Sequence, residues 1–287
     1  MTEGVERGGP RIRSLEGGDI AYCVGETARE GWSSTPDDFA VHLAHDPQGC
    51  FAAVVGGAPV GMITTTAYRA TGWIGNLIVA PGQRGKGIGT ALMRRAIDVL
   101  EARGLRTLRL EADPMGIAIY RDLGFRDEFD SPRFRLDAAP DGGPDPAAPL
   151  GAADLDAVAR FDAVRFGDGR RPLLALLLDR ASAAWRVPAR GRLAGYLMLL
   201  AGASGLRIGP WVADRPEAAR DLLHSALRRA AGRTVTLAVP GGNPGAPGLL
   251  ADAGFRLTPS SLRMMRGVGE GTGRPESVWA LANGAVG

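Results

Sequence analysis

A glycine-rich turn between a strand-like and a helix-like segment constrains this chain more than any other feature. The turn, Val79–Thr90, reads VAPGQRGKGIGT and continues the apolar segment Trp73–Val79. Its four glycines allow a tight turn and let backbone N–H groups approach a ligand without a Cβ in the way. Those amides, the positive end of the following helix, and the cations Arg84 and Lys86 together predict a phosphate or pyrophosphate site.

Two common phosphate-binding loops do not fit this turn. A P-loop has Lys followed by Ser or Thr after its last glycine, whereas Ile88 follows Gly87 here. The dinucleotide-binding motif needs a third glycine, and Leu92 stands at that position. What remains is the spacing Arg84-x-x-Gly87-x-Gly89.

The surrounding patterns predict an α/β fold with a mixed sheet, of the α+β kind. Runs rich in β-branched and apolar residues alternate with segments of helical periodicity and helix-capping signals. The expected strands of the first half include Cys50–Val55, Val60–Ala67, Trp73–Val79 and Thr107–Ala112, and the expected helices include Asp19–Gly31, Pro36–His45, Thr90–Arg103 and Ile117–Leu123.

A proline-rich stretch predicts two domains. Residues 138–150 contain four prolines and lack hydrophobic periodicity, which is typical of a linker. We therefore expect one domain over residues 1–137 and a second over 151–287, the latter with a C-terminal tail. The second half echoes the first: RIGPWVA at 207–213 is similar to WIGNLIVA at 73–80, and Gly254-Phe255 parallels Gly124-Phe125. These matches suggest an internal duplication.

With these features together, the chain resembles the GCN5-related N-acetyltransferase (GNAT) family. Residues 11–137 carry the likeness, through the loop Arg84–Gly89, the strand before it, and Tyr120-x-x-x-Gly124-Phe125. The resemblance implies two tandem GNAT-like domains, an active first copy and a degenerate second one. The second half has no glycine loop, and Leu250 stands where Tyr120 would be.

The resemblance also implies roles for individual residues. The strand would flank the pantetheine arm of acetyl-CoA, with a backbone amide near Ile78 polarising the thioester carbonyl. The loop would bind the pyrophosphate. Tyr120 would protonate the departing thiolate. Asp113 stands where relatives often have Asn, seven residues before the tyrosine. The implied cofactor-binding residues are Leu77, Ile78, Val79, Arg84, Gly85, Lys86, Gly87, Ile88, Gly89, Thr90 and Asp113.

A general base is harder to find. The strand Trp73–Val79, where many relatives carry a carboxylate, has only Asn76 as a polar side chain. Glu111 is the best candidate, because it leaves the face of its strand that Leu110 occupies and lies at the strand's end. Asp113 shares that face, and two neighbouring carboxylates can raise one pKa.

The expected function is transfer of an acetyl group from acetyl-CoA to a primary amine, by direct attack in a ternary complex. The alternative is an acyl-CoA-binding sensor or scaffold without turnover. The acceptor would be a small molecule or a peptide. Trp32 and Trp73 could line its pocket or belong to the core. We expect no metal, and a homodimer stays open.

Composition argues against a nucleic-acid partner and a membrane span, and it indicates a cellular location. The formal net charge is +3 without a run of like charge, so no nucleic-acid surface is expected. The apolar runs are too short to cross a membrane. The polar N-terminal segment has no signal-peptide core, and only two cysteines occur, so a cytoplasmic location is expected.

Overall fold

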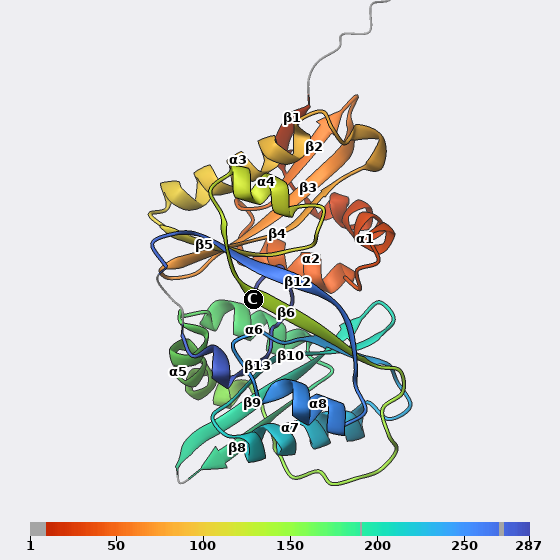
Figure 1. The fold of residues 1–287 in the computed structure, drawn as a ribbon, viewed down its shortest axis with the longest axis vertical. Helices are drawn as coiled ribbons and strands as arrows, with labels where there is room; N and C mark the ends of the chain where they lie inside the picture. Colours follow the sequence, from red (N-terminus) through yellow and green to blue (C-terminus); the bar gives the residue numbers. More distant parts are fainter. Residues whose placement is uncertain (1–9, 190, 270–272) are drawn as a thin grey trace, which may run out of the picture.

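The fold is a mixed α/β arrangement of two lobes joined by one sheet. It is taken from a computed structural model, which describes residues 10–189, 191–269 and 273–287. Within these ranges thirteen strands form a single sheet, in the order β1-β2-β3-β4-β5-β12-β6-β11-β10-β9-β8-β7, with β13 paired to β10. Figure 1 shows the lobes one above the other, with β6 and β12 crossing between them. The mixed sheet confirms the predicted fold class.

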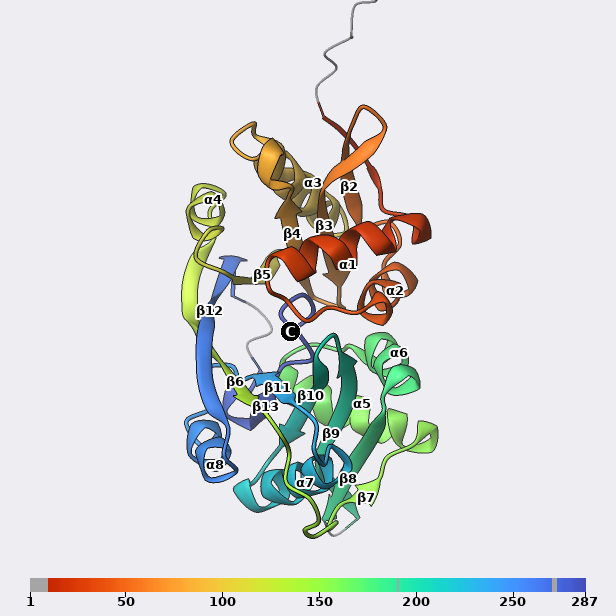
Figure 2. The ribbon, with the colours of Figure 1, turned by 90° about the vertical axis from the view of Figure 1, so that its right-hand side faces the viewer.

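The first lobe has its helices on both sides of a curved sheet (Figure 2). Its elements are β1 Arg11–Ser14, α1 Ile20–Arg29, α2 Pro36–His45, β2 Phe51–Val55, β3 Ala58–Ala67, β4 Thr71–Val79, α3 Ile88–Ala102, β5 Thr107–Ala112, α4 Ile117–Asp122 and β6 Arg126–Leu136. Helix α3 is amphipathic and buries Leu92, Met93, Ala96 and Leu100 against the sheet. This packing fixes the start of α3 beside the end of β4.

The second lobe repeats the plan of the first. Its elements are β7 Ala148–Pro149, α5 Leu155–Phe166, α6 Arg171–Arg180, β8 Ala183–Ala189, β9 Arg192–Gly202, β10 Gly205–Ala213, α7 Pro216–Arg229, β11 Val235–Ala238, α8 Ala246–Asp252, β12 Arg256–Gly267 and β13 Val278–Ala280. Strand β10 and helix α7 occupy the places of β4 and α3. None of the helices in the described ranges is both long enough and apolar enough to cross a bilayer.

The two lobes exchange their long strands. Strand β6 belongs to the first half of the sequence but pairs with β11 of the second, whereas β12 of the second half pairs with β5 of the first. The two exchanged strands also pair with each other along most of their length. Each lobe therefore completes its sheet with a strand from the other half.

This exchange predicts that the halves fold together. Expressed alone, residues 1–140 would leave one edge of β5 unpaired over Thr107–Ala112, an aggregation-prone state. We expect that half to be insoluble alone and soluble when co-expressed with residues 141–287, as judged by co-purification through a tag on one half. A monomeric first half that melts cooperatively would contradict the expectation.

Candidate active site

The diverging strands β4 and β5 open a cavity in the first lobe. They pair only at Thr71–Trp73, and from Ile74 onward the two strands separate. A cavity of about 460 Å³ lies where they part, bounded by β4, the glycine-rich turn and α4. The neighbouring strand β3 has Ile63 opposite both Asn76 and Leu77, so β4 bulges at this point.

The turn before α3 offers a row of free backbone donors to this cavity. Gly85 has φ 73° and Gly87 has φ 77°, values that favour glycine. The first intrahelical bond runs from the amide of Ala91 to the carbonyl of Gly87. No described backbone carbonyl accepts from the amides between Gly85 and Thr90, which is the arrangement that binds anions.

The structure brings nearly all the predicted cofactor residues together. Of the eleven, only Lys86 lies outside the cavity wall; its ammonium donates to the carbonyl of Gly82 at 3.1 Å and to Gln83 Oε1 at 2.8 Å. The ten in the wall are Leu77, Ile78, Val79, Arg84, Gly85, Gly87, Ile88, Gly89, Thr90 and Asp113. The cation Arg84 forms an ion pair with Glu30 and donates to the carbonyl of Val79 at 2.8 Å.

Tyr120 lines the same cavity from α4. The side chain is 8% exposed, and its ring meets that of Phe125 edge-on, with 6.2 Å between centroids. A Cβ at Gly116 would lie 2.9 Å from the Tyr120 hydroxyl, so the glycine makes room for the ring. Burial, with a smaller contribution from the charge of Asp113, raises the pKa of Tyr120 well above its ordinary value near 10. The hydroxyl is therefore protonated at neutral pH.

Glu111 lies at the same cavity, but three donors occupy its carboxylate. Ser131 donates at 3.1 Å, Ser261 at 2.9 Å, and the guanidinium of Arg263 forms a buried ion pair at 2.8 Å. Both serines and the arginine belong to the exchanged strands β6 and β12. A proton on Glu111 would disrupt this set of contacts, which disfavours the role of base expected from the sequence.

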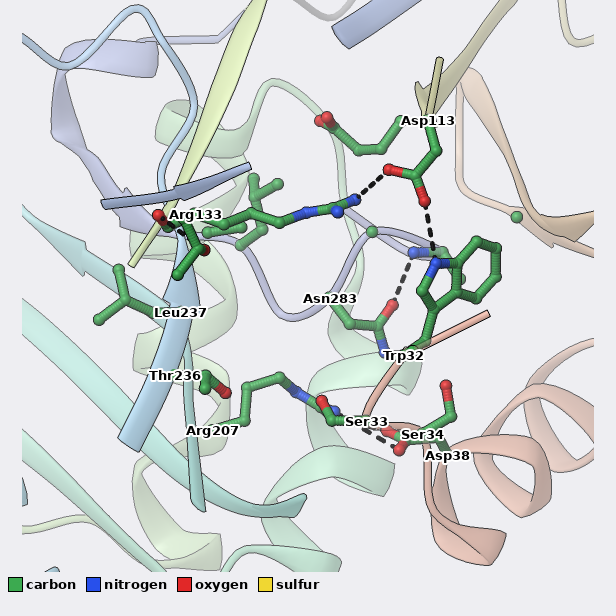
Figure 3. Close-up of a pocket in the computed structure, with 18 of the residues that line it drawn as sticks. Trp32, Ser33, Ser34, Asp38, Asp113, Arg133, Arg207, Thr236, Leu237 and Asn283 are labelled. Carbon is green, nitrogen blue, oxygen red and sulfur yellow. Dashed lines mark hydrogen bonds and ion pairs between the residues drawn. The ribbon is translucent and has the colours of Figure 1, made fainter. Parts of the chain in front are cut away.

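Asp113 links the first lobe to β6. Its Oδ2 accepts from Trp32 Nε1 at 2.9 Å, and its Oδ1 forms an ion pair with Arg133 at 2.8 Å (Figure 3). The carboxylate thus holds the loop between α1 and α2 against the strand that crosses to the second lobe. Asp113 keeps a structural partner on each side while it borders the cavity.

A second cavity, of about 360 Å³, lies between the lobes and meets the first. Figure 3 shows its wall, with Trp32, Ser33 and Asp38 from the first lobe facing Arg207 and Leu237 of the second. Five residues border both cavities, and they are Trp32, Gly75, Asn76, Glu111 and Asp113. The second cavity therefore adjoins the inner end of the first.

The segment after β13 closes this second cavity. Residues 281 and 283–285 line it, and the segment packs over Trp73, whose indole nitrogen donates to the carbonyl of Gly284 at 3.0 Å. Gly75 has no room for a side chain, because a Cβ there would lie 2.4 Å from Ala285. Of the two tryptophans considered from the sequence, Trp32 lines the cavity and Trp73 lies buried beneath the segment.

In the second lobe, the chain itself fills the equivalent of the first cavity. Strands β10 and β11 pair only at Leu206–Arg207 and then diverge, as β4 and β5 do. Strand β13 pairs with β10 at Trp211 and Val212, on the edge that faces β11, because β9 occupies the other edge. Trp279 packs against Trp211 with 5.5 Å between ring centroids and donates to the carbonyl of Ala213 at 3.1 Å. Strand β13 and Trp279 thus occupy the cleft between β10 and β11.

Sequence reasoning left Asn76 without a role, although it borders both cavities. Among the described residues it is the only non-glycine with a positive φ, 52°. Its Nδ2 lies 3.0 Å from Thr64 Oγ1 and 3.2 Å from His42 Nε2. The dipeptide Gly75-Asn76 inside a strand was the available signal, since both residue types are depleted in strands and mark bulges.

Each half of the chain matches a model of the same protein family. Residues 21–125 match the Acetyltransferase (GNAT) family, and residues 158–280 match an Acetyltransferase (GNAT) domain. A holothin acyltransferase of Pseudoalteromonas sp. (strain SANK 73390) is 26% identical over 88% of this chain and 86% of its own length. A streptothricin acetyltransferase of Streptomyces lavendulae is 36% identical over 35% of this chain and half of its own.

Solved structures share the two-lobed arrangement. A Pyrococcus horikoshii protein described as an acetyltransferase superposes with a TM-score of 0.84 at 25% identity, covering 100% of this chain and 99% of its own. A tandem GNAT protein from the clavulanic acid biosynthesis pathway superposes with a TM-score of 0.62 at 18% identity, covering 90% and 98% of the two chains. The second likeness concerns the fold alone.

Proposed function

Since the chain belongs to the GNAT family, with one domain of that family in each half, and is an N-acetyltransferase, we propose that it moves an acetyl group from acetyl-CoA to a primary amine in the first lobe. The observation that carries the proposal is the cavity between β4 and β5, with unbonded loop amides at one end and Tyr120 in its wall. The two acyl- and acetyltransferase relatives support acyl transfer as the reaction.

The proposed binding mode follows from the cavity walls. The amides between Gly85 and Thr90 would bind the pyrophosphate. The free edge of β4 at Leu77–Val79 would flank the pantetheine arm. This places the thioester near the residues that border both cavities, where the amine arrives from the interlobe side.

In the proposed reaction the neutral amine nitrogen attacks the thioester carbonyl carbon. The nitrogen–carbon bond forms, the carbon–sulfur bond breaks with its electron pair going to sulfur, and the nitrogen loses one proton to water. The Tyr120 hydroxyl, protonated at neutral pH, donates a hydrogen bond or a proton to the departing thiolate. A backbone N–H of β4 near Ile78 would stabilise the developing oxyanion.

The filled cleft of the second lobe predicts how many molecules bind. Calorimetry with acetyl-CoA is expected to give one site per chain, because Trp279 and its strand occupy the second cleft. The same protein should release CoA thiol when an amine panel is added. Two sites per chain would contradict this division of labour, and binding without thiol release for any amine would favour the alternative of a sensor or scaffold.

A further inference from the structure

The charged residues that the structure describes in the wall of the cavity between the lobes are all paired. Six charged residues line it, three acidic and three basic, and each has an opposite partner. The pairs are Arg207–Asp38 at 2.5 Å, Arg133–Asp113 at 2.8 Å, Arg263–Glu111 at 2.8 Å and Arg135–Asp137 at 2.6 Å. An ammonium group entering such a cavity would lose hydration without finding a free carboxylate. The wall therefore disfavours a charged acceptor.

The imidazole of His42, which also lines this cavity, stays neutral and is already engaged. Burial lowers the pKa of His42 to about 4, with neighbouring charges acting in both directions: Asp38 and Asp46 raise it and His45 lowers it. Its Nε2 lies 3.2 Å from the side-chain nitrogen of Asn76. With Nε2 accepting from that amide, the ring has no free basic nitrogen to offer a substrate.

Glu111 and Asp113 are the titratable residues that border both cavities, and the carboxylate of Glu111 is held by Ser131, Ser261 and Arg263. Asp38 and Asp113 are each paired with an arginine. In the described wall, then, no carboxylate or imidazole is free to take a proton from the acceptor. An amine that arrives charged has no protein group ready to deprotonate it.

Two carboxamides in the wall are oriented by their own hydrogen bonds. Asn76 directs its Nδ2 to Thr64 and His42, and no described residue donates a hydrogen bond to its Oδ1, which is left as an acceptor. The Oδ1 of Asn283 accepts a hydrogen bond from the backbone amide of Ala285 at 2.8 Å. This leaves the Nδ2 of Asn283 as a donor on the cavity side (Figure 3). The wall thus offers one fixed acceptor and one fixed donor.

We propose that the acceptor is a small, weakly basic primary amine that is uncharged at neutral pH and carries a hydrogen-bond acceptor such as a carbonyl. Asn76 Oδ1 receives an N–H of the amine and orients the nitrogen lone pair, and Asn283 Nδ2 donates to the carbonyl. The proton that the nitrogen loses after attack leaves to water. This inference rests on the proposed acetyl transfer and names its substrate class.

A matched pair of amines tests the substrate class. 4-Aminobenzamide and 4-(aminomethyl)benzamide share the ring and the carbonyl, but only the second is an ammonium ion at pH 7. We expect kcat/KM for the first to be at least about tenfold higher at pH 7 and flat between pH 6 and 8. For the second, kcat/KM should rise about tenfold per pH unit, because only its neutral fraction reacts.

Other outcomes separate the inference from the function on which it rests. Equal or better use of the benzylic amine, with a flat pH profile, would show a base in the protein and overturn the inference while acetyl transfer stands. Better use of a lysine peptide or of spermidine would also overturn it. Bound acetyl-CoA with no transfer to any amine would overturn the proposed function and this inference with it.

Two variants of Asn76 test the oriented amide directly. Asn76→Gly keeps the positive φ without strain and removes the carboxamide. We expect kcat/KM for 4-aminobenzamide to fall about 10–100-fold with acetyl-CoA affinity nearly unchanged, and Tm to fall because the buried Thr64 and His42 lose a hydrogen-bond partner. Asn76→Asp places a carboxylate without an arginine partner in the wall, beside Thr64 and His42. The preference should therefore shift by at least about tenfold towards the benzylic amine. Wild-type preference and rates in both variants would contradict the assigned role.

Discussion

Replacing Tyr120 with phenylalanine is expected to lower kcat by roughly 10²–10⁴-fold, the usual range for a positioned proton donor. The substitution removes one hydroxyl and keeps the ring, its edge-on contact with Phe125 and its fit over Gly116. Acetyl-CoA affinity should barely change, because the hydroxyl matters mainly as negative charge develops on sulfur. Thiol release under saturating acetyl-CoA measures kcat, and calorimetry measures the affinity.

The pH dependence of the rate gives a second test of the role of Tyr120. Because burial raises the pKa of Tyr120 above its ordinary value, the hydroxyl keeps its proton through pH 9, and the wild-type enzyme should not lose activity there through this group. Tyr22→Phe is the matched control: Tyr22 is a partly buried tyrosine of α1 whose hydroxyl has no described partner and lines neither cavity. Equal rates for Tyr120→Phe and this control would remove Tyr120 from the mechanism.

Short-range signals predicted two elements beside the cavities well. The expected helix Pro36–His45 and the expected strand Thr107–Ala112 have the bounds that the structure shows for α2 and β5. In α2 a capping box between Thr35 and Asp38 marks the start, with Pro36 in the first turn. In β5 alternation between apolar and polar residues was sufficient. Both signals are local, so the sequence alone carries them.

The exchanged strands could not be predicted in the same way. Strand β6 reads RDEFDSPRFRL, rich in charge and interrupted by Pro132, which argues against a strand in the middle of a sheet. Its charges are balanced by residues 20 and 19 positions away in the first half, as in Arg133 with Asp113 and Glu128 with Arg109. Its strand partners, β11 and β12, belong to the second half, so no local pattern predicts how β6 pairs.

The candidate site also has a part that local sequence predicts and a part that only distant segments form. The cofactor loop and Tyr120 lie within 40 residues of each other and carry recognisable spacing. The acceptor cavity gathers Trp32, Arg207 and Asn283 from segments more than 70 residues apart, and the locking of Glu111 needs Ser261 and Arg263 from the other half. Sequence reasoning could therefore select Glu111 as a carboxylate near the reaction but could not see the partners that hold it.

Replacing Gly89 with valine is expected to weaken acetyl-CoA binding about 100-fold or more, a loss of about 2.7 kcal/mol in binding free energy. Gly89 lies in the first turn of α3 with ordinary helical backbone. A Cβ there would lie 3.7 Å from Val79 and 3.8 Å from Ile119, ordinary contacts with two residues of the cavity wall. The branched side chain would therefore fit the fold while occupying space between β4 and α4.

The control is the same substitution at Gly82. That glycine is exposed, has no described atom within 4 Å of an added Cβ, has no positive φ and lies outside the cavity wall. Gly82→Val should bind acetyl-CoA as the wild type does, with both variants folded by circular dichroism and of similar Tm. If a folded Gly89→Val keeps wild-type affinity, acetyl-CoA does not lie between β4 and α4. The proposed role of Tyr120, which depends on the thioester lying there, would then have no basis.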